Sequence, residues 1–127
     1  MVRYKTIGKK NPQDLLAPEK FYAQIIADGR IDLKALAFFV SKQSTVSRAD
    51  CYAVLISLVE WITFHLSEGK IVDLGDLGSF RLSLSSTGQE LAEDFNASAI
   101  KKAKIIFSPG ADLKSMLNTI KYTKVEV

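Results

Sequence analysis

The stretch "EGKIVDLGDLGSFRL", residues 68–82, contains the signals that decide the fold. Gly69 is a favoured residue directly after a helix, so the helix before it is expected to stop here. Gly75 and Gly78 supply the permissive backbone that a tight turn requires. From Phe80 onward, apolar residues alternate with polar ones, which is typical of a strand with one covered face. The stretch therefore predicts a helix end, a tight hairpin and the start of a strand.

Two helices are predicted upstream of this stretch. Asp32 can cap the first, and the apolar residues that follow it recur at helical spacing. They are Leu33, Leu36, Ala37 and Val40. The second helix starts with Ser47-Arg48-Ala49-Asp50, which resembles a capping box with aspartate in the last position. It is expected to run to about Ser67, two residues before Gly69.

The second helix is apolar on most of its sides. Its polar stripe is narrow and consists of Asp50, Ser57, Glu60 and Ser67. A surface helix needs an apolar stripe only a little over about 100° wide, so this helix must be covered on several sides. A chain of 127 residues has few elements to cover it, and we therefore expect a second subunit. The predicted dimer core includes Leu55, Leu58, Val59, Ile62 and Phe80.

A basic strand face is predicted after the hairpin. The segment "AIKKAKIIF", residues 99–107, has Lys102 and Lys104 on one face and Ala103, Ile105 and Phe107 on the other. If Leu82 and Leu84 of the preceding strand face the core, Arg81 points outward beside the two lysines. The connection "STGQELAEDFNAS", residues 86–98, is polar and acidic.

Two further elements are predicted near the C-terminus. The segment "SPGADLKSMLNTI", residues 108–120, predicts a short helix with Pro109 near its first position, where a missing N–H costs little. The segment "KYTKVEV", residues 121–127, predicts a last strand.

The N-terminal residues predict two strands joined by a turn. "VRYKTIGKK", residues 2–10, alternates apolar and basic positions, and "EKFYAQIIADG", residues 19–29, is rich in aromatic residues and isoleucine. The break between them contains "GKKNPQD", residues 8–14, with an Asn-Pro turn signal. Two interpretations are open: Lys9 and Lys10 reach phosphates from a hairpin tip, or the segment is a solvated turn.

Composition and charge narrow the class of protein. Apolar residues make up 47% of the chain and charged residues 24%, a globular balance. The net charge is +3, with a balance of +3 in residues 1–31, +4 in residues 101–127 and −3 in residues 86–100. Basic charge therefore lies near the two ends of the chain, and an acidic patch interrupts it.

Several functional classes find no support in the sequence. Cys51 is the only cysteine and His65 the only histidine, so neither a disulfide nor a metal or nucleophile site can be assembled. We therefore expect no enzyme, no metal, no cofactor and no small-molecule substrate. The longest charge-free apolar run, Cys51 to Val59, is half of the roughly 20 residues that a membrane span needs. Without a secretory signal either, the expectation is a soluble cytoplasmic protein.

The order of these elements and three motifs resemble the bacterial histone-like HU/IHF family over residues 32–117. The first motif is Ser47-Arg48-Ala49-Asp50. In the second, Glu68 to Leu82, the residues Leu77-Gly78-Ser79-Phe80 match the family's Phe-Gly-Asn-Phe turn. The third is "IIFSPGADLKSML", residues 105–117, which is similar to the family's "AFKPGKALKDA" end. Residues 1–31 and 118–127 are then added terminal strands around this core, in a single HU-like domain.

The resemblance implies an α+β fold, an intertwined homodimer, and a two-stranded arm from each subunit that enters the DNA minor groove. The family's arm is rich in arginine and lysine with Arg-Asn-Pro at its tip, whereas residues 86–98 are acidic and contain no proline. Ser108 also replaces the family's basic residue before Pro-Gly. The expected function is an architectural, nucleoid-associated protein that condenses duplex DNA with little sequence preference. The expected DNA contacts are Arg81, Lys102 and Lys104, with additions from Lys9, Lys10 and Lys101. The alternative is a dimeric protein-interaction module on this fold that has lost DNA binding.

Overall fold

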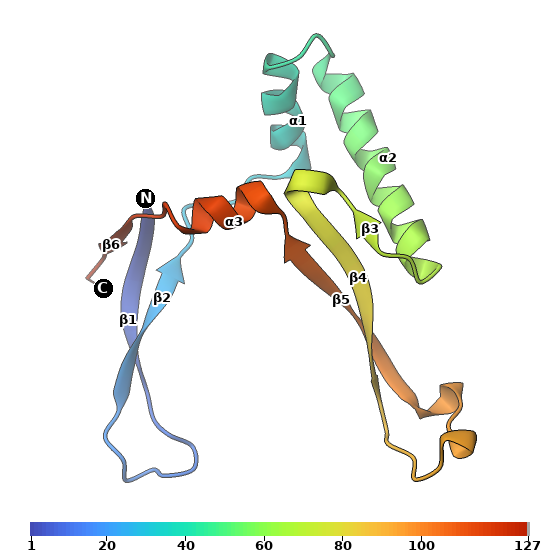
Figure 1. The fold of residues 1–127 in the computed structure, drawn as a ribbon. Helices are drawn as coiled ribbons and strands as arrows, with labels where there is room; N and C mark the ends of the chain where they lie inside the picture. The colour runs from blue at the N-terminus through green and yellow to red at the C-terminus, as the bar shows by residue number, and fades with distance from the viewer. Residues whose placement is uncertain (127) are drawn as a thin grey trace. The chain divides into compact units, whose positions relative to one another are not determined.

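The computed structural model describes residues 1–126 as a mixed α+β structure (Figure 1). These residues form three α-helices and two three-stranded sheets, which confirms the α+β class of the predicted fold. The chain divides into two compact units. One contains residues 33–116, and the other contains residues 1–32 with the C-terminal segment from Leu117.

Two antiparallel helices begin the first unit. α1 spans Leu33–Lys42 and α2 spans Arg48–Ser67, and they lie side by side in Figure 1. The predicted cap of α2 is present, since the Asp50 N–H donates to Ser47 Oγ at 3.1 Å. The predicted stop is also present, because Gly69 has a φ of 80°, in the left-handed region that glycine favours.

The sheet of this unit has the strand order β3-β4-β5. β3 spans Val72–Asp73, β4 spans Gly78–Ser86 and β5 spans Ile100–Pro109, and both pairings are antiparallel. A 3-10 turn, Gly75–Leu77, joins β3 to β4 as the predicted hairpin. β4 and β5 extend away from the helices as a two-stranded arm, which carries two short 3-10 turns, Ala92–Asp94 and Ala97–Ala99, near its far end (Figure 1).

The third helix, α3, spans Ala111–Leu117. We expected Pro109 near the first position of this helix, and that expectation was wrong. Pro109 is the last residue of β5, paired opposite Gly78, and the helix begins two residues later. The end of an edge strand tolerates proline's missing N–H as well as a helix start does. Pro109 is therefore compatible with its place in β5.

The second unit is a three-stranded sheet built from both ends of the chain. β1 spans Val2–Lys9, β2 spans Lys20–Ile26 and β6 spans Tyr122–Lys124, in the order β2-β1-β6. β1 pairs antiparallel with β2 and parallel with β6. The three predicted terminal strands are therefore present and form one sheet.

Few apolar side chains are buried within the described chain, namely Ala37, Cys51, Leu66 and Ala99. Cys51 is a free, buried thiol. In contrast, α2 leaves Val54, Val59 and Trp61 more than half exposed. The sequence predicted that α2 is covered on several sides, but these apolar side chains of α2 are exposed in the single chain.

The composition of α2 also bears on the membrane expectation. The helix has 20 residues, and an 18-residue window within it has a mean hydropathy of 1.3, so by length and composition it could cross a membrane. The charge-free run Cys51 to Val59 understated this because Glu60 interrupts the run but not the helix. The core helix of a water-soluble protein has the same length and composition, so this property is weak evidence for a membrane span.

Candidate nucleic-acid interface

The register of the arm places the three predicted cations on one face. Arg81 lies opposite Ile106, Ser83 opposite Lys104, and Ser85 opposite Lys102. Residues paired across an antiparallel ladder share a face, and rows two residues apart on that face are about 7 Å apart. Arg81, Lys104 and Lys102 thus form a row of positive charge, called here the basic face, in which the other polar residues are small serines.

The opposite face of the arm is apolar. The Phe80 and Phe107 rings lie 4.9 Å apart between centroids, and Leu82 faces Ile105 in the next row. We expected Leu82 and Leu84 to face the core, but within one chain they are 38% and 62% exposed. The alternation of apolar and polar side chains along β4 was predicted correctly. The prediction that Leu82 and Leu84 face a core is not met within the single chain.

Lys101 does not belong to the basic face. The register shifts between Ser85 and Ser86, because Ser85 pairs with Lys102 while Ser86 pairs with Ile100. Lys101 is the residue that this β-bulge inserts into β5. The sequence gives no signal for the bulge, so the grouping of Lys101 with its neighbours was not foreseeable.

The far end of the arm carries negative charge. Glu93 and Asp94 lie in the 3-10 turn Ala92–Asp94, and Glu90 precedes it. All three side chains are exposed. The acidic end therefore lies beyond the bulge, separated along the strands from the basic face.

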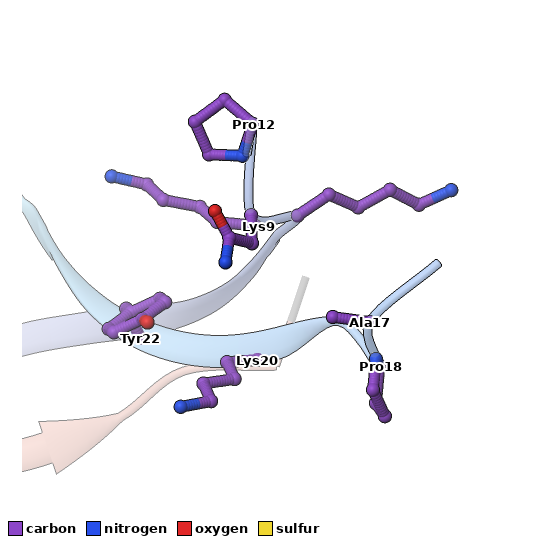
Figure 2. A pocket seen from close by; sticks show the side chains of 8 residues that line it. Lys9, Pro12, Ala17, Pro18, Lys20 and Tyr22 are labelled. Carbon is purple, nitrogen blue, oxygen red and sulfur yellow. The ribbon is translucent and has the colours of Figure 1, made fainter. Parts of the chain in front are cut away.

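A second group of cations lies where the β1–β2 hairpin turns. Lys9 and Lys20 face each other across the last pair of the ladder, and Lys10 follows at the start of the loop. Together with Tyr22 they line a pocket of about 540 Å³. Figure 2 shows Lys20 and Tyr22 on the strand and Pro12 on the loop across from them. The sequence singled out Lys9 and Lys10 but missed Lys20 and Tyr22, because these residues come together only through the pairing of β1 with β2.

The cations of both groups are available to a ligand. Within residues 1–126 one ion pair is present, between Arg3 and Asp28 at 3.4 Å, and it lies in neither group. The side chains of Arg81, Lys102 and Lys104 are exposed, as are those of Lys9, Lys10 and Lys20. Among the described residues no cluster of histidine, cysteine or carboxylate side chains could hold a metal ion.

The predicted dimer-core residues are spread over α2 and β4. Leu58 and Val59 are 38% and 52% exposed, and Leu55, Ile62 and Phe80 are half-buried. At the C-terminal end of the same helix, Trp61 stacks on His65 with ring centroids 5.9 Å apart. These residues give the unit a large apolar surface that extends along one helix and one face of the arm.

The model of one protein family matches residues 1–124 of the chain. That family is HU-HIG, described as an HU domain fused to a wHTH, Ig or Glycine-rich motif. The chain belongs to this HU family. The match includes the terminal strands as well as residues 32–117, so β1, β2 and β6 are part of the HU-HIG pattern.

A solved structure has the same fold. It is described as a "Putative bacterial DNA binding protein" from Bacteroides vulgatus ATCC 8482, with a TM-score of 0.64 and 15% sequence identity. The similarity covers 97% of this chain and 48% of that one, so the HU-HIG chain spans about half the length of that protein. A search of curated proteins gives no match.

Proposed function

We propose that this HU-HIG protein binds duplex DNA as a homodimer, through the DNA backbone and shape, with little sequence preference. The observation that carries the proposal is the basic face of the arm, where Arg81, Lys104 and Lys102 lie in consecutive rows. None of the three takes part in an ion pair in the described part of the chain. Lys9, Lys10 and Lys101 are weaker candidate contacts.

The chemistry of the basic face fits phosphates better than base edges. Ammonium and guanidinium groups neutralise phosphates and release condensed counterions, which supplies most non-specific affinity. Ser83 and Ser85 lie between the cations and can donate hydrogen bonds to phosphate oxygens. Such contacts fix the position of a protein on DNA without reading its sequence. The role that we propose is architectural and non-catalytic, on the nucleoid in the cytoplasm.

The dimer is supported by the exposed surface of the chain. Within residues 33–116 the apolar sides of α2 and the apolar face of the arm are exposed, with Val59, Leu84 and Ile105 more than half exposed. A second copy that covers these surfaces would double the basic face to six cations.

A salt titration tests the proposal. With up to six phosphate contacts in a dimer, the slope of log affinity against log salt is expected to be about −3 to −6 on B-form duplex. Lys102→Ala combined with Lys104→Ala should weaken binding to all sequences alike and make the slope shallower. Lys9→Ala combined with Lys10→Ala is the matched control, which should keep more of the slope. If only the control variant loses the slope, the basic face is not the contact.

The second candidate is a dimeric protein-interaction module that no longer binds DNA. The acidic end of the arm favours it, because Glu90, Glu93 and Asp94 would be repelled by phosphates. A wild-type protein that binds no duplex even at low salt would establish this candidate in place of the first.

A further inference from the structure

The pocket at the turn of the β1–β2 hairpin combines positive charge with an aromatic ring. Its lining consists of Lys9, Lys10, Asn11, Pro12, Ala17, Pro18, Lys20 and Tyr22, and no carboxylate is among them. Its volume of about 540 Å³ is within the range of pockets that hold small ligands. Three lysine residues in the lining of one pocket, with no acidic residue among them, favour an anionic ligand.

The ladder arranges the ring and two of the lysines on one face of the sheet. Lys9 pairs with Lys20 and Ile7 pairs with Tyr22, so the four side chains occupy two consecutive rows. Lys9 Nζ lies 5.9 Å from the centroid of the Tyr22 ring. Tyr22 is 49% exposed, so the residue is accessible to a ligand.

The loop that closes the pocket is held by its own hydrogen bonds. The Gln13 N–H donates to Asn11 Oδ1 at 2.9 Å, and the Asp14 N–H donates to the Asn11 carbonyl oxygen at 3.1 Å. Pro12 and Pro18 each fix one backbone dihedral angle of the loop. These hydrogen bonds and prolines restrict the backbone of the loop that lines the pocket (Figure 2).

We propose that this hairpin pocket binds single-stranded DNA, with phosphates on Lys9, Lys10 and Lys20 and one unstacked base on the Tyr22 ring. Positive grooves with an aromatic platform recognise single strands in this way, because the bases of a single strand have free faces. In an intact duplex the base faces are stacked, so only the lysines could take part. The inference rests on the proposed DNA-binding function and adds a second site, separate from the basic face of the arm.

The test compares two oligonucleotides of equal charge, both about 12 nucleotides long. One is oligothymidine, and the other has the same backbone with abasic sites in place of the bases. Fluorescence anisotropy at low salt should show oligothymidine bound more tightly by the wild type, on the order of tenfold for one stacked base. Tyr22→Leu should bring this ratio to about one, whereas Tyr22→Phe should keep it.

The lysines have a different signature in the same assay. Lys9→Ala combined with Lys20→Ala should weaken both oligonucleotides equally and leave their ratio unchanged, because phosphates are present in both. Circular dichroism and thermal unfolding show whether each variant keeps its fold. Equal wild-type affinity for the two oligonucleotides, binding of neither, or an unchanged ratio in Tyr22→Leu would each overturn the pocket.

A duplex titration in parallel separates this failure from that of the proposed function. If the wild type binds duplex but does not distinguish the two oligonucleotides, only the proposal of the hairpin pocket fails. If the wild type distinguishes the oligonucleotides but binds no duplex, the pocket proposal stands and the proposed duplex binding fails.

Discussion

At the scale of single residues, Gly78 combines a positive φ with close neighbours, so both its backbone conformation and the available space require glycine. Its φ is 137°, and a Cβ added there would meet the Ser108 carbonyl oxygen and the Phe107 ring. We predict that Gly78→Ala destabilises the protein by at least about 1–3 kcal/mol, since L residues rarely adopt this backbone conformation. Urea unfolding at fixed protein concentration measures the loss. Gly88→Ala is the control: nothing lies within 4 Å of its added Cβ, so a change within about 0.5 kcal/mol is expected.

The same residues show what a sequence can and cannot predict at this scale. Ser47, Gly69 and Gly78 were identified correctly because caps and turns depend on local backbone chemistry that a single residue type satisfies. Pro109 was misplaced because a strand end and a helix start tolerate proline for the same reason, its missing N–H. The choice between them depends on the pairing of Pro109 with Gly78, a contact 31 residues away in sequence.

At the scale of elements, the arm combines a basic face with an acidic end. We predict that replacing Glu90, Glu93 and Asp94 together by lysine tightens duplex binding, on the order of tenfold at low salt, because repulsion becomes attraction. The matching replacement by glutamine, glutamine and asparagine should give an intermediate affinity. Anisotropy on one duplex measures all three proteins. Unchanged or weaker binding by the lysine variant would mean that the acidic end is far from DNA or is already placed productively.

The faces of the arm were predictable, whereas its bulge and the hairpin pocket were not. A period of two in "AIKKAKIIF" places Lys102 and Lys104 on one face whatever the partner strand does. The bulge at Lys101 depends on the register with Ser85 and Ser86, for which the sequence carries no local signal. The pocket likewise required the pairing of β1 with β2, because Lys9 and Lys20 are far apart in sequence and meet only across the ladder.

At the scale of the whole molecule, the main question is what covers the apolar surface. The sequence predicted a helix that needs covering on several sides, and the described chain leaves α2 largely exposed. Lipid and a second copy of the chain are two covers that its length and composition allow. A dimer also accounts for the exposed apolar face of β4 and β5, which a membrane-spanning α2 would leave uncovered. We therefore infer that a second copy of the chain covers both surfaces.

The last prediction tests that inference. If α2 lies at the centre of the dimer, Leu58→Asp places an unpaired carboxylate in an apolar interface, at a cost of several kcal/mol. This is comparable to the whole stability of a typical domain, so light scattering and circular dichroism should show loss of both dimer and fold. Leu16→Asp is the control, because Leu16 is 96% exposed in the hairpin loop and should tolerate the charge. A wild-type protein that is a folded monomer at micromolar concentration would contradict the dimer, and co-sedimentation with lipid vesicles would show instead that lipid covers α2.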